Sequence, residues 1–280
     1  MRFFQVDVFA SGPYTGNPLA VFPEASELDG KQMQRIAQEM HLSEKTFVTR
    51  YDAGSYEMRI FTPTAELPFA GHPTIGTAWV LGNLGFVDGE AIEQRTAAGI
   101  THVERRDEIV SFTRQGSVEA DLALSAYPSI AEALGVEVSD IGIEAGWVAR
   151  PLAPAIADAG IAQLHIPLMD EEVLRRAALP KPLESLNEGG AYCFTALGPG
   201  RWRTRGFYPG WGITEDAATG SAAATLGLLL ADRLGPIEAE LEQGVEMKRP
   251  ASISIEAAGG SVKVGGRVVP IFAGELQNLP

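Results

Sequence analysis

Apolar and polar residues alternate singly along much of the chain, most clearly near its two ends. The pattern covers residues 3–9, and it returns at 252–256 and 260–268. Neighbouring side chains of a half-buried strand point to opposite faces, so a period of two predicts strands. With apolar runs bounded by Gly, Pro or Asn, the same rule predicts further strands at 19–22, 46–50, 56–61, 91–96, 99–105, 108–115, 190–197 and 202–208.

Three segments have helical features instead. The first runs to about Met40 after Asp29, a residue type that caps helix N-termini, and its apolar residues share one face. A second helix is predicted from Pro73 to Leu84, because proline is favoured in a first helical turn. A third is predicted over 219–233. The region 122–182 has weaker periodicity.

One short pattern occurs twice. Residues 59–63 and 205–209 both read R-x-F-x-P, at an offset of 205 − 59 = 146 residues. Each copy is followed by an acidic residue and then by a run of small residues that opens a predicted helix. The shared order indicates a duplicated strand–loop–helix unit.

Composition and charge limit the possible partners. The chain is 45% hydrophobic and 21% charged, which is typical of a folded protein. Its 22 basic and 36 acidic residues give 22 − 36 = −14, which disfavours a nucleic-acid partner. The longest apolar stretch, around 222–231, is shorter than the ~18 residues that span a bilayer, and Asp7 interrupts the N-terminal pattern where a signal peptide would be apolar. We expect a cytoplasmic protein without a membrane partner.

Cysteine and histidine usage excludes further classes of site. The single cysteine, Cys193, lies in an apolar strand pattern and is expected to be a buried thiol rather than a nucleophile. The four histidines lack metal-ligand spacing, and the chain has no phosphate-binding loop or dinucleotide fingerprint. We therefore expect neither a metal nor a cofactor.

The starts of the second and third helices are candidate binding elements. Helix N-termini offer unpaired N–H groups and a partial positive charge, and glycine permits close approach of a ligand. Gly71 opens one such start, and Gly220, Ser221 and Ala222 open the other. As a facing pair they favour a site for a small carboxylate; taken singly, they are ordinary helix starts.

Three side chains are candidates for the chemistry. Glu44 precedes an apolar strand, where partial desolvation would raise its pKa and suit it to acid and base catalysis; alternatively it is a surface residue paired with Lys45. His72 is placed to orient a substrate or to hydrogen-bond a loop. Asp216 is placed to cap a helix or to serve as a second catalytic carboxylate.

The chain resembles the phenazine-biosynthesis PhzF-like family, which is related to diaminopimelate epimerase. The resemblance covers nearly the whole chain. It is carried by motifs in the expected order: G-N-P-L-A-V at 16–21, L-S-E-x-T-F-V at 42–48, R-I-F-T-P at 59–63, E-L-P-F-A-G-H-P-T at 66–74, E-D-A-A-T-G-S-A at 215–222, E-Q-G at 242–244 and R-P at 249–250.

The resemblance implies an α/β (α+β) fold of two pseudo-symmetric domains, each a curved sheet wrapped around a central helix. We expect the domains at 1–115 and 116–268, with the tail 269–280 able to pack back onto the first, and the active site between them. A homodimer is expected by the same analogy. The related epimerase carries two catalytic cysteines at its helix starts; this chain has none there, which excludes a two-thiol racemase.

Carried over from the family, the roles fall on Glu44 as the proton shuttle, on His72 and Asp216 as substrate-holding residues, and on Ser221 as part of the carboxylate site. They imply a cofactor-independent isomerase acting on a small carboxylate-bearing substrate, similar to dihydro-3-hydroxyanthranilate isomerase. Two alternatives stay open. One is a single-carbon epimerase using Glu44 and Asp216; the other is a non-catalytic protein that binds a small carboxylate.

Three residues depart from the family pattern. His41 stands where Asn is common, Lys45 replaces a small or hydroxyl residue, and Lys248 stands where Gly is usual. They leave the proposed catalytic set intact and leave the substrate open.

Overall fold

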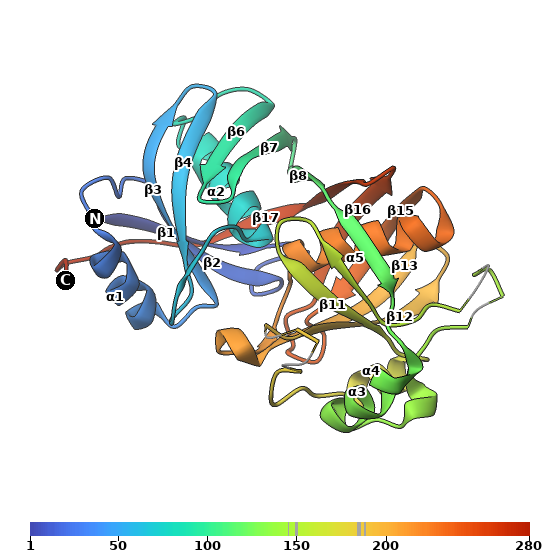
Figure 1. The fold of residues 1–280 in the computed structure, drawn as a ribbon. Helices are drawn as coiled ribbons and strands as arrows, with labels where there is room; N and C mark the ends of the chain where they lie inside the picture. Colours follow the sequence, from blue (N-terminus) through green and yellow to red (C-terminus); the bar gives the residue numbers. More distant parts are fainter. Residues whose placement is uncertain (145, 149–150, 184–185, 188) are drawn as a thin grey trace. The chain divides into compact units, whose positions relative to one another are not determined.

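Strand pairing repeats in the same order in two parts of the chain. The computed structural model describes residues 1–144, 146–148, 151–183, 186–187 and 189–280 and divides into two units (Figure 1). Unit 1 comprises 1–113 with 265–280, and unit 2 comprises 114–264. Two strands, β8 (Ile109–Gln115) and β17 (Ser261–Glu275), run from one unit into the other.

Unit 1 contains two helices and the first strands of the chain. Its remaining elements are β1 (Arg2–Val8), β2 (Asn17–Phe22), α1 (Gly30–Met40), β3 (Glu44–Asp52), β4 (Ser55–Phe61), β5 (Glu66–Leu67), α2 (Gly71–Asn83), β6 (Ala91–Thr96) and β7 (Gly99–Arg106).

Unit 2 contains three α-helices among its described residues. Its elements are β9 (Ser117–Asp121), α3 (Tyr127–Leu134), β10 (Ala155–Asp158), β11 (Ala162–Pro167), α4 (Glu171–Arg176), β12 (Ala191–Gly198), β13 (Arg201–Tyr208), β14 (Ile213–Asp216), α5 (Gly220–Leu234), β15 (Ile237–Gln243) and β16 (Ala251–Ala258), with short 3-10 turns at Leu124–Ala126, Val138–Asp140 and Pro209–Trp211.

The pairings of the two units correspond step by step. In unit 1, β1 pairs antiparallel with β2, β2 parallel with β3 across α1, β3 antiparallel with β4, β4 parallel with β6, and β6 antiparallel with β7. In unit 2, β10, β11, β12, β13, β15 and β16 repeat this series, with α4 in the place of α1. The two copies of the R-x-F-x-P pattern begin on β4 and β13, the equivalent strands, and extend just past their ends.

A buried helix lies inside the strands of each unit. Helix α2 contacts β1, β2, β3, β6 and β7, and helix α5 contacts β9, β10, β11, β15 and β16 (Figure 1). Both helices are apolar on nearly all sides, as expected for helices surrounded by sheet. None of the helices in the described ranges has the length and hydropathy that crossing a membrane requires.

Local sequence explains how α1 begins. The Asp29 carboxylate accepts a hydrogen bond from the Gln32 backbone at 2.9 Å, and the Gln32 side chain accepts one from the Asp29 backbone at 3.0 Å. This capping box satisfies two N–H groups that a helix start otherwise leaves unpaired. The predicted cap at Asp29 is therefore confirmed.

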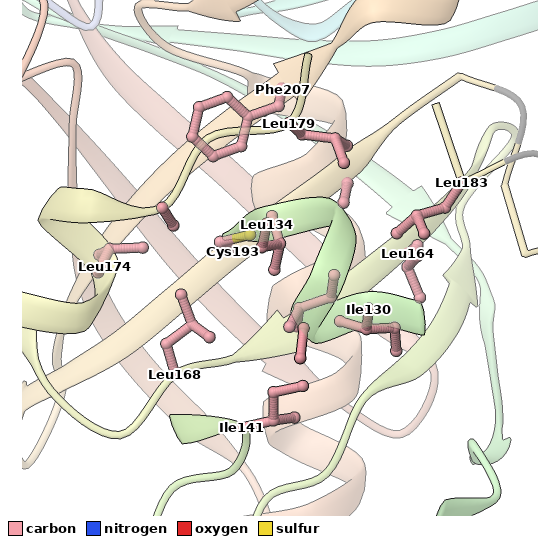
Figure 2. Close-up of a cluster of buried hydrophobic side chains, with 14 of the residues drawn as sticks. Ile130, Leu134, Ile141, Leu164, Leu168, Leu174, Leu179, Leu183, Cys193 and Phe207 are labelled. Atoms are coloured by element: carbon pink, nitrogen blue, oxygen red, sulfur yellow. The ribbon is translucent and has the colours of Figure 1, made fainter. Parts of the chain in front are cut away.

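Unit 2 has an apolar cluster between its sheet and helices α3 and α4, drawn in Figure 2. Cys193 lies within it, on β12, and burial raises the pKa of its thiol to about 12. The expectation of a buried thiol is confirmed.

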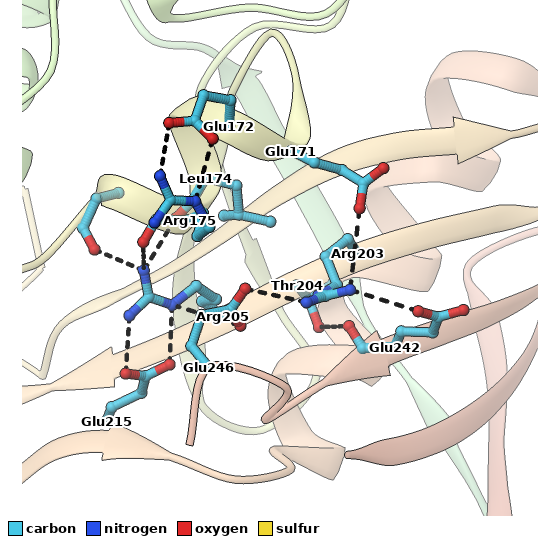
Figure 3. Close-up of polar contacts among 11 residues, drawn as sticks. Glu171, Glu172, Leu174, Arg175, Arg203, Thr204, Arg205, Glu215, Glu242 and Glu246 are labelled. Carbon is cyan, nitrogen blue, oxygen red and sulfur yellow. Dashed lines mark hydrogen bonds and ion pairs between the residues drawn. The ribbon is translucent and has the colours of Figure 1, made fainter. Parts of the chain in front are cut away.

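The two R-x-F-x-P segments build the same local contacts. Arg59 makes a paired ion contact with Glu66 and lies over the Phe61 ring at 5.2 Å. Arg205 makes a paired contact with Glu215 and lies over the Phe207 ring at 4.7 Å. Figure 3 shows that Arg205 also reaches backbone carbonyls beside α4, from Leu174, Arg175 and Ala177.

Candidate active site

Glu44 is the first residue of β3 and is only 6% exposed. Helix α1 ends at Met40, His41 takes a left-handed conformation, and the chain enters the strand at Glu44. Glu44 is therefore not a surface residue, and that part of the alternative is wrong. Lys45 is itself buried, and its Nζ donates to the Leu42 carbonyl at 2.7 Å.

Lys45 still contributes to the electrostatics around Glu44. Burial lowers the pKa of Lys45 to about 8, and the charge of Glu44 opposes that shift. The opposing effect shows that the two charges interact, although adjacent strand residues point to opposite faces.

His72, in the first turn of α2, is brought to Glu44. His72 Nε2 lies 3.5 Å from Glu44 Oε2, and both side chains are almost fully buried. This separation is long for a hydrogen bond, as catalytic contacts often are without substrate. Burial lowers the pKa of His72 to about 3, so the ring is neutral near pH 7. A neutral imidazole can donate one hydrogen bond to the carboxylate.

Two residues without a predicted role extend this contact. Asn17, at the start of β2, places its Nδ2 3.3 Å from His72 Nδ1. The Ser43 hydroxyl donates to Asn17 Oδ1 at 3.1 Å. Asn17 belongs to the G-N-P motif and Ser43 to the S-E motif, both of which carry the family resemblance. Membership of these motifs is the feature of the sequence from which the two residues could have been selected.

Asp216 and the start of α5 form a second group, within unit 2. The N-cap of α5 is Thr219, whose hydroxyl donates to Asp216 Oδ2 at 2.7 Å. Because Thr219 holds the cap position, the prediction of Asp216 as the cap is wrong. Asp216 is buried, with 4% of its surface exposed. Gly220 and Ala222 are also buried, whereas Ser221 between them is only partly buried.

Gln243, at the end of β15, braces this group and was not predicted from the sequence. Its Oε1 accepts from the Thr219 backbone at 3.0 Å and from the Tyr192 hydroxyl at 2.8 Å. Its Nε2 donates to the Asp216 carbonyl at 2.9 Å and to the Thr219 hydroxyl oxygen at 3.0 Å. It belongs to the E-Q-G motif, which carried the resemblance without assigning a role.

The structure thus forms two groups from the predicted site residues. Glu44, His72 and Gly71 lie together in unit 1. Asp216 and the start of α5 lie together in unit 2.

A buried carboxylate beside a neutral imidazole is an arrangement suited to general acid–base catalysis. The comparisons with known proteins identify the class of enzyme. The PhzC-PhzF family model, described as phenazine biosynthesis-like protein, matches residues 6–274. The chain belongs to this family and is an isomerase of it.

The most similar curated relatives include two trans-2,3-dihydro-3-hydroxyanthranilate isomerases. The one from Pseudomonas aeruginosa is 39% identical over 94% of this chain and 92% of its own length. That from Pseudomonas chlororaphis is 37% identical over 97% of each chain. A solved structure of a predicted epimerase from P. aeruginosa is 31% identical, covers 99% of both chains and has a TM-score of 0.84.

Proposed function

We propose that the protein is a cofactor-independent isomerase that moves a proton between two carbons of a small carboxylate-bearing substrate. In this proposal the Glu44 carboxylate removes a proton from one carbon, the electron pair left behind shifts the double bond, and the Glu44 carboxyl returns the proton to another carbon. No atoms or electrons are gained or lost in the sequence. The observation that carries the proposal is the buried Glu44 carboxylate, with a neutral histidine 3.5 Å away.

We further propose that the second group binds the substrate. Asp216 would hold a polar substituent, and the start of α5 at Gly220, Ser221 and Ala222 would bind the carboxylate, while Gly71 contributes from the start of α2. Backbone N–H groups at a helix start suit an anion, and such fixed dipoles stabilise the negative charge that develops when a carbon-bound proton is removed. The similarity to trans-2,3-dihydro-3-hydroxyanthranilate isomerases supports a cyclic amino or hydroxy acid as the substrate class.

The test is proton NMR in D₂O with trans-2,3-dihydro-3-hydroxyanthranilate and a panel of amino and hydroxy acids. Wild-type protein should introduce deuterium at a carbon, and Glu44→Gln should reduce the rate by about 10²-fold or more, as for loss of a general base. Glu39→Gln is the matched control, because Glu39 is an exposed glutamate on the neighbouring helix α1. Wild-type rates in Glu44→Gln would refute the assignment.

A second candidate, a single-carbon epimerase, is favoured by the similarity to the predicted epimerase. It would need a second acid or base, for which Asp216 is the candidate. Deuterium at the same carbon with inverted configuration would support it, and movement of a double bond would support the isomerase.

A homodimer is part of the proposal, by analogy with the family. Sedimentation equilibrium should give about twice the chain mass of 29.8 kDa. A mass near that of one chain would contradict it.

A further inference from the structure

Four polar side chains form a continuous series that ends at Glu44. Ser43 contacts Asn17, Asn17 contacts His72 Nδ1, and His72 Nε2 faces Glu44. They come from three different places in unit 1: the start of β2, the entry to β3 and the first turn of α2. Only Ser43 and Glu44 are neighbours along the chain; the fold brings Asn17 and His72 to them.

The series has two possible hydrogen-bond polarities. With Asn17 Nδ2 toward His72, the ring accepts at Nδ1 and carries its proton on Nε2. With the amide turned over, Asn17 Oδ1 would accept from Nδ1–H, and a bare Nε2 would face the carboxylate. The second arrangement sets two acceptors against each other whenever Glu44 is ionised. The first gives the carboxylate a donor, and it is the one in which the Ser43 hydroxyl donates to Asn17 Oδ1.

We propose that Asn17 is a positioning residue that holds His72 in the neutral tautomer with its proton on Nε2, directed at Glu44. The inference rests on the proposed role of Glu44 for its effect on turnover, whereas the tautomer itself is a property of the ligand-free protein. Which ring nitrogen carries the proton is set by the partner of the other nitrogen.

In the reaction, His72 and Glu44 would then have different roles. His72 stays neutral and donates to one oxygen of Glu44 throughout, so it neither takes nor delivers the substrate proton. Burial acts in the same direction, since it lowers the pKa of His72 to about 3 and disfavours the imidazolium. The carboxyl of Glu44 then carries the proton alone.

The experiment is a long-range ¹H–¹⁵N spectrum of the ¹⁵N-histidine-labelled protein, recorded without substrate from pH 5.5 to 8. His72 is assigned by loss of its signals in His72→Gln. The wild type should show a protonated Nε2 and a bare Nδ1 at His72, with no titration in this range. A protonated Nδ1 with a bare Nε2 in the wild type would overturn the proposal.

Asn17→Asp is the informative variant, because it keeps the shape of the side chain and replaces the donor with an acceptor. His72 should then gain a proton on Nδ1, and kcat should fall about 10- to 100-fold with a smaller change in KM, as for other residues that orient an active group. Ser43→Ala should give a smaller loss, because it removes one contact of the Asn17 amide and leaves the amide in place. Asn83→Asp, the same change at an exposed position of α2, is the control. An unchanged His72 spectrum and kcat in Asn17→Asp would overturn the proposal.

The proposal about the His72 tautomer and the proposed function can be refuted independently of each other. If the wild type exchanges no deuterium but shows the Nε2–H tautomer, the proposed function fails and the assignment of Asn17 stands. If deuterium exchange depends on Glu44 but His72 carries its proton on Nδ1, the proposed function stands and the assignment of Asn17 fails.

Discussion

The equivalent strands β4 and β13 each carry an arginine paired with a glutamate, yet the two pairs lie in very different surroundings. In unit 1 the side chains of Arg59 and Glu66 are 36% and 39% exposed. In unit 2 those of Arg205 and Glu215 are 8% and 16% exposed. Arg59 lies against Gly30, at the start of α1, whereas Arg205 donates to three carbonyls in and after α4.

The contrast shows that one motif can serve two purposes after duplication. A cation at the C-terminal end of a helix satisfies carbonyls that have no partner in the helix and complements the helix dipole. Helix α4 has only six residues, so Arg205 fixes an element that propensity alone cannot maintain. Helix α1 has eleven residues and its own capping box, so it needs no such support from Arg59.

The largest expected effect comes from breaking the buried pair. Arg205→Met should lower the free energy of unfolding by about 3–5 kcal/mol, because it leaves a poorly solvated carboxylate and three carbonyls unpaired. Arg59→Met should cost at most about 1 kcal/mol, as for an exposed ion pair. Urea unfolding is the suitable measurement, since urea does not screen charge.

Tryptophan fluorescence and circular dichroism should both be followed in that experiment. Three of the four tryptophans, Trp147, Trp202 and Trp211, lie in unit 2, so fluorescence reports mainly on that unit. Equal losses for the two methionine variants would show that the buried pair has no special role.

The next effect concerns two buried glutamines, one in each unit. Gln94 accepts from the Tyr56 hydroxyl and donates to Thr74, on α2. Gln243 makes four hydrogen bonds, three with Thr219 and Asp216 and one with Tyr192. Gln243→Leu should therefore cost about 2–3 kcal/mol and Gln94→Leu about 1–2 kcal/mol, since each buried group left unpaired costs about 1 kcal/mol or more.

Activity distinguishes the two leucine variants further. Because Gln243 holds the Asp216 backbone and the start of α5, its loss should raise KM in the proposed reaction. Gln94→Leu should leave KM close to that of the wild type. A larger change of KM in Gln94→Leu would contradict the proposed binding role of the Asp216 group.

A smaller effect comes from one buried histidine in each unit, His72 and His165. Burial lowers the pKa of both to about 3, below the value near 6.5 of an exposed histidine. The unfolded chain therefore binds more protons between pH 3 and 6.5, and stability is lost as the pH falls through 6.5. Each should cost about 1 kcal/mol at pH 5.5 relative to pH 7.5.

The measurement is urea unfolding at several pH values between 5.5 and 7.5, a range above the titration of ordinary carboxylates. Replacement of His165 by Gln should remove about half of the pH dependence due to the pair. If the free energy of unfolding depended on pH as in the wild type in both His72→Gln and His165→Gln, neither ring would be held neutral in the folded protein.

The smallest effects are gains, at two of the departures from the family pattern. His41 and Lys248 both have left-handed backbones, with φ of 50° and 60°. Asn and Gly tolerate this region better than other residues, so the backbone favours the residue types expected from the resemblance. Lys248→Gly should gain up to about 1 kcal/mol and His41→Asn a few tenths, about 0.3 kcal/mol, measured by thermal unfolding. A loss of stability in both would show that side-chain contacts outweigh the backbone.

Sequence patterns predicted most of the elements with strong periodicity and missed those in the region of weak periodicity. The helices α1, α2 and α5 and the strands β1, β3, β4, β12 and β13 lie where the patterns place them, within a few residues. By contrast β10, β11 and α4 have four to six residues each and lie in the region of weak periodicity. Their positions follow from tertiary pairing with β9 and β12, which a local pattern does not contain.

The candidate site was predicted in part for the same reason. Glu44 and His72 could be selected by type and position, and the structure brings them together. Asn17 could not, because its role depends on a ring nitrogen 55 residues further along the chain. The left-handed conformations of His41 and Lys248 also leave no signal in a hydrophobic pattern.

The pairing of β1 with β17 sets the order in which the protein can mature during synthesis. Arg2 pairs with Glu275, across 275 − 2 = 273 residues. At ribosomal rates, the β1 edge of the nascent first unit waits for about 15 to 50 s before its partner strand exists. During that interval it presents unpaired backbone groups, which are a template for wrong pairing. All residues of unit 2 are synthesised before residues 265–280 of unit 1, so unit 1 is the later of the two to have its full set of strands.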